Sequence, residues 1–432
     1  MARGMTTDTT IARVHARRVF DSRGHPTVEV DVELAGGARG RAIAPAGASR
    51  GSREAVDLRD GGSRFGGRDV MVAIDNVNRA IADALAGVDA HDQALVDATL
   101  ITLDGTPLKT KLGGNATVAT SLAVAHAASA AAGLPLWRYL AGEGPVSLPL
   151  PQIQILGGGA HAAQRIDIQD LMVMPIGAWT WSDALAIVAG VYRAAGELLA
   201  AEGRLVGVAD EGGYWPALDR NEDALDLVLR AVERSGHAPG DDVVIALDLA
   251  ATEFCRDGHY VLARDNARLD RDAWAEKLLR WVERYPIRSL EDPFAEDDRD
   301  AWVAFARAAP SRLQIVGDDY LVTSAAAIDA AAADHACNAA LIKVNQAGTL
   351  TEARAALAAT ARAGFGAIVS ARSGETEDVS IAHLAVGANA GQIKVGSFAR
   401  SERMAKWNEL LRIEEAGGAA MAFAGVGALR HA

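Results

Sequence analysis

The stretch Val243-Val244-Ile245-Ala246-Leu247-Asp248 is a short apolar run that ends in a carboxylate. The same arrangement returns in Arg288–Glu291 and Gln314–Asp318, and segments of helical periodicity such as Arg271–Glu283 lie between the runs. Apolar runs that alternate with helices are typical of βα units and a parallel sheet. This stretch therefore predicts an α/β fold.

The same alternation extends in both directions along the chain. Further candidate strands and helices are Asp170–Met174, Ala340–Asn345, Ala367–Ser370, Gln392–Val395, Ser182–Glu202, Glu222–Ser235, Ala325–Ala336 and Leu350–Arg362. About eight strands after residue 146 favour a closed (β/α)8 barrel. An open doubly wound sheet is the alternative, but its G-x-G-x-x-G fingerprint is not met, because Gly157-Gly158-Gly159 is followed by Ala160-His161.

Residues 1–145 have a different pattern. An alternating strand, Thr27–Leu34, ends in Gly36-Gly37, and helical patterns follow near residues 69–86 and 115–132. This mixture predicts an α+β domain over residues 1–145, followed by the barrel domain over residues 146–432.

Charge and cysteine content bound the partners and the compartment. The 432 residues carry a formal net charge of −13, which argues against nucleic acid and acidic membranes as partners, because both need an electropositive face. A small anionic substrate is compatible with that charge, since a metal ion or converging lysines can reverse the local field. Cys255 and Cys337 are too few for a disulfide framework, and no signal peptide or membrane-length run is evident, so we expect a cytoplasmic protein.

Three successive candidate strands end in carboxylates, namely Asp248, Glu291 and Asp318. The first two acids are 43 residues apart and the last two are 27 apart, which leaves room for a helix and a return strand each time. Because the carboxyl ends of barrel strands meet at one mouth, we expect the three acids to converge there. Each acid alone could cap the next helix, but three in register favour hard oxygen ligands for Mg²⁺.

The next strands carry cations. Lys343 and Lys394 interrupt otherwise apolar strands, where a buried lysine is costly unless it is paired; protection of an edge strand is the alternative. Burial beside a divalent cation would lower the lysine pKa and provide a general base near neutral pH. Arg372 and Ser373 follow another strand and suit a phosphate group. Together these groups indicate abstraction of a proton next to a carboxylate.

Eight motifs resemble those of the enolase family, in the same order and over nearly the whole chain. They are Asp21–Thr27, Gly47–Ser49, Leu103–Thr106, Asp210–Gly213, Glu291–Pro293, Lys343–Gln346, Ser373–Thr376 and Arg400–Arg403. The resemblance implies a small α+β domain that caps a modified β/α barrel, and usually a homodimer or a larger homo-oligomer. It also implies the Mg²⁺-dependent, reversible dehydration of 2-phosphoglycerate to phosphoenolpyruvate.

The resemblance implies roles for individual residues as well. By position, Asp248, Glu291 and Asp318 match the ligands of one Mg²⁺. Ser49 matches a ligand of a second Mg²⁺, and Lys343 matches the base that takes the proton from C2. The remaining matches are Lys394 for the substrate carboxylate, Arg372 and Ser373 for the phosphate, Glu211 for the acid that assists departure of the hydroxyl, and His161 and Gln169 for active-site loop positions.

Several positions depart from the enolase pattern. Relative to the family, a histidine has become Ala371, a glutamate Asp170, a threonine Arg50, an asparagine Gly157 and a glycine Ala209. Ala371 removes a titratable, hydrogen-bonding ring from the active site. Asp170 is shorter by one methylene group at a position beside the leaving hydroxyl, and a shift of that size can be costly for proton transfer.

We interpret these departures as specialisation for a modified 2-phosphoglycerate. Ala46 and Ala371 would provide room, and Arg50 would offer a bidentate site for an extra carboxylate. The relatives that fit are the carboxyphosphonoenolpyruvate synthases of phosphonate and phosphinate antibiotic pathways, whose substrate side carries a phosphonoformate unit. An ordinary enolase that has drifted is one alternative. A non-catalytic binding homologue is another, weakened because both lysines, the three acids and Glu211 remain.

Overall fold

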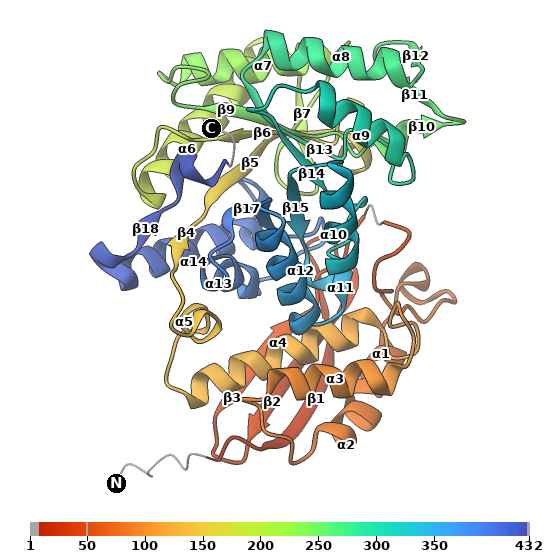
Figure 1. Cartoon of the computed structure of the whole chain (residues 1–432), viewed down its shortest axis with the longest axis vertical. Coiled ribbons are helices and arrows are strands. Elements are labelled where there is room, and N and C mark those ends of the chain that lie inside the picture. The colour runs from red at the N-terminus through yellow and green to blue at the C-terminus, as the bar shows by residue number, and fades with distance from the viewer. Residues whose placement is uncertain (1–7, 49–50, 430–432) are drawn as a thin grey trace.

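The computed structural model describes residues 8–48 and 51–429, apart from the side chain of His161. A smaller N-terminal domain and a larger barrel domain are stacked along the long axis of the molecule (Figure 1). The boundary that we predict at residues 145–146 lies in the segment between α5, which ends at Ala141, and β4, which begins at Ser147.

The N-terminal domain is a three-stranded antiparallel sheet covered by helices. Its strands pair in the order β1 (Ile11–Phe20), β2 (Pro26–Leu34) and β3 (Arg39–Ile43). The predicted strand Thr27–Leu34 is therefore confirmed, whereas the predicted helical pattern near residues 69–86 is divided into three pieces. The helical segments are η1 (Arg64–Gly67), α1 (Met71–Asn76), the π-helical η2 (Val77–Ile81), α2 (Ala82–Leu85), α3 (Gln93–Asp104), α4 (Gly114–Ala131) and α5 (Leu136–Ala141).

Helix α4 packs directly on this sheet and on the barrel domain. Fifteen of its residues are buried, and most are small, so the backbones of α4 and β3 approach closely. A Cβ atom on Gly40 of β3 would lie 2.1 Å from the carbonyl oxygen of Ala123 and 2.2 Å from the backbone nitrogen of Ala127. Only glycine fits at this crossing. On its other side, the Thr117 hydroxyl of α4 donates a hydrogen bond of 2.8 Å to the carbonyl oxygen of Gly348 in the barrel domain.

Eight strands close the barrel, because the last of them pairs with the first. In ring order they are β5 (Leu150–Gly157), β6 (Asp170–Met174), β9 (Val244–Asp248), β13 (Ile287–Glu291), β14 (Gln314–Gly317), β15 (Ala339–Ile342), β16 (Gly366–Ser370) and β17 (Gly391–Ser397). The predicted closed α/β barrel with an N-terminal capping domain is thus the observed fold.

The expectation of a fully parallel sheet is wrong for β6, which runs antiparallel to both β5 and β9. The reason lies in the connection: residues 158–169 between β5 and β6 contain only the short 3-10 helix η3 (Gly159–Ala162), and a parallel return needs a longer crossover. The reversal places Asp170, the first residue of β6, opposite Asp248, the last residue of β9. Asp170 therefore lies at the same mouth as the strand-end acids.

Strand β5 was not among the predicted strands. Its polar residues Gln152 and Gln154 interrupt the apolar run, yet all eight of its residues are buried. Gln152 Nε2 donates to Gln392 Oε1 at 3.0 Å, and Gln392 Nε2 donates to Gln314 Oε1 at 2.8 Å, across the inside of the barrel. Because amides from three strands satisfy one another, a polar strand is buried here without cost in unmade hydrogen bonds.

Helices cover the outside of the barrel (Figure 1). They are α6 (Trp181–Ala201), α7 (Asn221–Arg234), α8 (Arg271–Arg284), α9 (Arg299–Ala308), α10 (Ala325–Asp334), α11 (Val344–Ala347), α12 (Leu350–Arg362), α13 (Ser380–Gly387) and α14 (Ser401–Gly417). The shorter strands are β4 (Ser147–Leu148), β7 (Leu205–Val208), β8 (Tyr214–Pro216), β10 (Cys255–Arg256), β11 (His259–Leu262), β12 (Ala267–Leu269) and β18 (Ala422–Phe423), and the other 3-10 turns are η4 (Ala251–Phe254), η5 (Gly418–Ala420) and η6 (Gly425–Ala428).

One helix qualifies by length and composition as a candidate membrane span, contrary to our expectation that no segment approaches one. This helix is α6, with 21 residues. Its buried residues recur every three or four positions, as in Leu185, Val188 and Val191, and face α7, α14 and β5. That stripe is typical of a barrel helix that packs one face on the core.

Replacing Gly40 by alanine should lower the free energy of unfolding by about 1–3 kcal/mol, because the new methyl group overpacks the contact between β3 and α4. Urea unfolding followed by circular dichroism measures the change. Gly207→Ala is the matched control, since a Cβ atom there meets no heavy atom within 4 Å. Equal losses in the two variants would contradict the steric explanation.

Candidate active site

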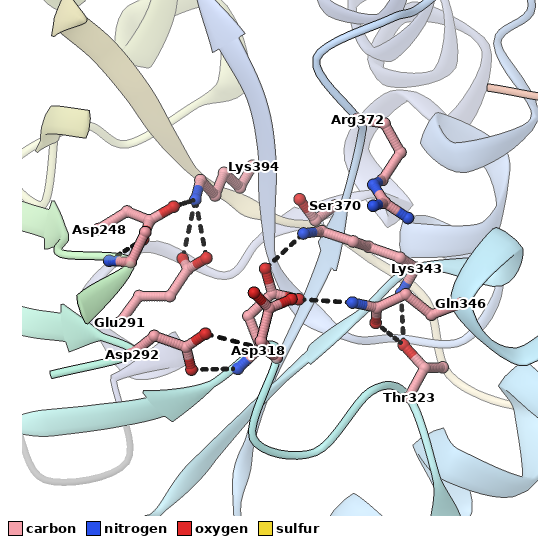
Figure 2. A network of polar contacts seen from close by, with 12 residues as sticks. Asp248, Glu291, Asp292, Asp318, Thr323, Lys343, Gln346, Ser370, Arg372 and Lys394 are labelled. Atoms are coloured by element: carbon pink, nitrogen blue, oxygen red, sulfur yellow. Dashed lines mark hydrogen bonds and ion pairs between the residues drawn. The ribbon is translucent and has the colours of Figure 1, made fainter. Parts of the chain in front are cut away.

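The charged groups predicted from the strand ends come together at one mouth of the barrel (Figure 2). Asp248 and Glu291 are the last residues of β9 and β13, and Asp318 follows β14 directly. All three acids are buried. The alternative that they cap the following helices is wrong, because α8, α9 and α10 are capped by the side chains of Asp270, Asp298 and Ser324.

Lys394 is the cation at the centre of this mouth. Its Nζ lies 2.7 Å from Asp248 Oδ2, 2.9 Å from both carboxylate oxygens of Glu291 and 3.4 Å from Asp170 Oδ2. Burial lowers the pKa of Lys394, but the charges of Asp248 and Glu291 outweigh it and hold that pKa well above its ordinary value. One ammonium thus joins acids from three strands.

Lys343 pairs with the third acid in a closed ring of hydrogen bonds. Its Nζ lies 2.5 Å from Asp318 Oδ2, and Gln346 Nε2 donates to Asp318 Oδ1 at 2.8 Å. The Thr323 hydroxyl accepts from the Lys343 backbone N–H at 2.9 Å and donates to Gln346 Oε1 at 2.6 Å (Figure 2). The ring begins and ends on Lys343, so it restrains both the backbone and the ammonium. Sequence reasoning did not identify Thr323 or Gln346 as part of the site.

The expectation of a lowered Lys343 pKa refers to a site that holds a divalent cation, and the charges of the protein alone give the opposite direction. Burial lowers it, but the Asp318 carboxylate raises it more, so the pKa lies above its ordinary value in the protein's own charge distribution. Asp318 must be engaged by another cation before Lys343 can serve as a base near neutral pH.

Arg372 and Ser373 are held by the N-terminal domain. Arg372 Nη1 and Nη2 lie 2.8 and 3.3 Å from the two carboxylate oxygens of Glu54, and both residues are buried. Ser373 Oγ accepts from the Ala48 backbone N–H at 2.7 Å and lies 3.3 Å from Arg23 Nη1. Glu54 was missed from the sequence, because an ion pair over 318 residues leaves no local pattern.

One pocket brings together most of the predicted site. It is lined by Gly47, Ala48, Gln169, Asp170, Glu211, Asp248, Lys343, Ser370, Ala371, Arg372, Ser373, Lys394 and Val395. Gln169 Nε2 donates to Asp248 Oδ2 at 3.0 Å, which connects the loop before β6 to the acid group. Ser49 and Arg50 lie outside the described residues. For His161 only the backbone is described, within η3.

The acids offer a donor set that suits a divalent cation. Asp170, Asp248, Glu291 and Asp318 are buried around two lysines, so the negative charge exceeds the positive charge of these ammonium groups. Burial and the charge of Asp248 raise the pKa of Glu291 well above its ordinary value. Carboxylate oxygens are the ligands that Mg²⁺ prefers. Gln169 Oε1 adds a buried oxygen that has no hydrogen-bond partner within the described part of the chain.

The expected metal ligands are nevertheless divided between the two lysines. Asp248 and Glu291 contact Lys394, whereas Asp318 contacts Lys343. One group of three described carboxylates, Asp292, Asp318 and Asp319, offers oxygens that all lie within 4.8 Å of one another. Asp292 accepts the backbone N–H groups of Asp318 and Asp319, each at 2.8 Å, so it holds the end of β14 in place.

Two departures from the enolase pattern occupy the same space. A Cβ atom on Gly157 would lie 2.5 Å from the Cβ atom of Ala209, closer than two carbons can approach. A side chain at position 157 and a methyl group at position 209 therefore exclude each other. Positions 157 and 209, next to the Glu211 loop, are therefore sterically coupled.

Gly157→Ala should lower the free energy of unfolding by about 1–3 kcal/mol, because its methyl group overlaps that of Ala209. In an Ala209→Gly background the same substitution should cost less, with an interaction energy of about 0.5–3 kcal/mol. Urea unfolding of the four proteins in this double-mutant cycle measures it. Additive effects would show that the two positions are independent.

Comparison with known protein families matches both domains of the chain. Residues 11–140 match the enolase N-terminal domain, and residues 145–432 match the enolase C-terminal TIM barrel domain. Enzymes with these domains are generally Mg²⁺-dependent lyases that bind small phosphorylated substrates and are often oligomeric. Since the two matches cover almost all of the sequence, the chain belongs to the enolase family.

Proposed function

We propose that this protein forms an enolpyruvate product from a modified 2-phosphoglycerate, by abstraction of the C2 proton and β-elimination, and that it acts as a carboxyphosphonoenolpyruvate synthase. The observation that carries the proposal is the pocket itself. It holds Lys343, Lys394 and Arg372 together with Asp170 and Glu211, while Ala371 lies on its wall. The two lysines and the acids that the proposed proton abstraction and elimination need are thus present. Asp170 and Ala371, which also line the pocket, differ from the residues expected in the family.

The proposed chemistry uses residues on different elements of the mouth. Lys343 Nζ takes the proton from C2, and Lys394 faces the substrate carboxylate. Glu211 gives a proton to the departing hydroxyl oxygen, with Asp170 beside it in the same pocket. Bound Mg²⁺, with Asp248, Glu291 and Asp318 as ligands of one ion and Ser49 as a ligand of a second, would supply positive charge to the carboxylate side of the substrate.

The phosphate end supports a substrate with an additional anionic group. Glu54 neutralises the buried Arg372, so this guanidinium carries little uncompensated charge. A further carboxylate would therefore need another cation, and Arg50 is one residue from the proposed metal ligand Ser49. Ala371 is a small side chain on the pocket wall where the family has a histidine. In the proposed function, the loss of this ring provides the room that a larger substrate needs. Phosphonoformate provides a carboxylate of this kind.

Ordinary dehydration of 2-phosphoglycerate is the alternative, because Lys343, Lys394 and Glu211 all line the pocket. The retained constellation also argues against a non-catalytic binding role. A cytoplasmic homodimer or larger homo-oligomer, with no nucleic-acid or membrane partner, is part of the proposal. It rests on the acidic net charge of −13 and on the family's tendency to form oligomers.

The substrate can be tested by supplying Mg²⁺-loaded protein first with 2-phosphoglycerate and then with the analogue in which a phosphonoformate unit replaces the phosphate on the C2 oxygen. We expect a carboxyphosphonoenolpyruvate signal in ³¹P NMR, formed by loss of water from the analogue, and little turnover of 2-phosphoglycerate, because Arg50 and Ala371 favour the larger anion. Rapid formation of phosphoenolpyruvate from 2-phosphoglycerate alone would instead support an ordinary enolase. Arg50→Thr should reduce turnover of the modified substrate, and unchanged turnover would remove Arg50 as the anion partner.

Lys343→Ala should abolish exchange of the C2 proton with solvent, because no other group in the proposed chemistry takes that proton. Proton NMR in D₂O follows the loss of the C2 signal. The loss should exceed about 10²-fold, the lower end of general-base effects. Lys109→Ala is a control with another buried, ion-paired lysine, located 2.8 Å from Glu352 and away from the pocket. Retained exchange in Lys343→Ala would refute the base assignment.

A further inference from the structure

Gln154 connects Asp170 to the loop that carries Glu211, and these are the two acids of the proposed leaving-group side. It belongs to β5 and is fully buried. Its Nε2 donates a hydrogen bond to Asp170 Oδ1 on β6, and its Oε1 accepts the backbone N–H of Gly213 at 2.8 Å. Gly213 ends the loop that carries Glu211. A single amide thus connects Asp170 with the Glu211 loop.

The orientation of this amide follows from its partners. A backbone N–H can only donate, so the Gly213 N–H must face Oε1, and the NH₂ group must then face Asp170. Asp170 Oδ1 is therefore an acceptor. The other oxygen, Oδ2, lies 3.4 Å from Lys394 Nζ. The amide and the ammonium together set the direction of the Asp170 carboxylate.

A second connection runs through the backbone of Gln154. The Ser397 hydroxyl donates to the carbonyl oxygen of Gln154 at 2.5 Å, and the Ser397 backbone N–H donates to the carbonyl oxygen of Glu211 at 2.9 Å. The end of β17 therefore joins β5 to the same loop. The Gln154 side chain thus holds the Glu211 loop at Gly213, and Ser397 connects the backbone of Gln154 to the backbone of Glu211.

A glycine makes room for the long side chain of Gln154. A Cβ atom on Gly213 would lie 2.4 Å from Gln154 Oε1, whereas one on Gly157 would meet Gln154 Nε2 at 3.4 Å, an ordinary van der Waals contact. The close approach of the Glu211 loop to this amide therefore depends on Gly213.

We infer that Gln154 is a positioning residue that sets the place of Asp170 relative to Glu211 for the elimination step. Asp170 is one methylene group shorter than the glutamate of the family, and Gln154 is the side chain that reaches it. The length of the amide side chain compensates for the short acid. This inference rests on the proposed elimination chemistry, in which Lys343 removes the C2 proton separately from the acids that assist the leaving group.

The length match can be tested by exchanging one methylene group between the partners. Gln154→Asn shortens the amide, Asp170→Glu lengthens the acid, and the double variant restores their combined reach. We expect each single variant to lower kcat for elimination by about 10- to 100-fold with little change in KM, because a misplacement of about 1 Å has effects of that size. The double variant should recover most of the loss. Failure of the double variant to recover would overturn the inference.

The rate of C2 proton exchange distinguishes a specific effect on the leaving-group acids from a general loss of structure in the active site. Lys343, which takes the C2 proton in the proposed mechanism, follows β15, whereas Gln154 and Asp170 lie on β5 and β6. Gln154→Asn should therefore slow elimination while the rate of C2 exchange stays within about twofold of wild type. Gln152→Asn is the matched control: it shortens a second buried glutamine on β5, whose partner Gln392 lies inside the barrel. The ratio of elimination to exchange should be unchanged in that control. An equal loss of both rates in Gln154→Asn would overturn the inference.

A measurement that needs no substrate distinguishes this inference from the proposed function. Hydrogen–deuterium exchange of residues 209–213 should become faster in Gln154→Asn, because the Gly213 N–H loses its acceptor, and should stay at wild-type protection in Gln152→Asn. Wild-type protection in Gln154→Asn would overturn the positioning role. If wild-type protein shows no C2 exchange with any tested substrate, the proposed function fails, but the hydrogen-exchange result still tests the contact.

Discussion

The barrel mouth depends on the buried ammonium of Lys394, which contacts acids from three strands. Asp248, Glu291 and Asp170 come from β9, β13 and β6, and each would be costly to bury as an unpaired charge. The second cation, Lys343, does the same for Asp318. The excess of negative charge that remains is the feature that suits this mouth to a divalent cation. The same cluster therefore joins the barrel strands through ion pairs and provides the carboxylate groups for a divalent cation.

The N-terminal domain covers the site on the side of the barrel where Arg372 and Ser373 follow β16. Glu54 pairs with Arg372, and Ala48 and Arg23 contact the Ser373 hydroxyl. Buried polar contacts of this kind exclude water, which strengthens the electrostatic interactions inside the pocket. The close packing of α4 on both domains, made possible by small residues, keeps these groups in register. Covering domain and barrel therefore form one site, and neither provides it alone.

Two sets of contacts define the buried space beside the Glu211 loop. A side chain at position 157 would overlap the methyl group of Ala209, so these two positions are sterically coupled. Gln154 joins Asp170 on β6 to the backbone of Gly213, and its amide is therefore hydrogen-bonded through both its nitrogen and its oxygen. These contacts hold the loop and the two strands together as one unit.

The sequence by itself determined the α/β class, seven of the barrel strands, and four charged residues that lie on these strands or directly after them, Asp248, Glu291, Lys343 and Lys394. These features follow from local periodicity and from the rule that barrel strands present their carboxyl ends at one mouth. Only the tertiary structure decided the reversed direction of β6, the polar strand β5, and the contacts of Glu54, Thr323 and Gln154. Their partners lie 16 to 318 residues away in the sequence. Contacts at such separations depend on how the strands and the two domains pack against one another. A local pattern of residues carries no information about that packing.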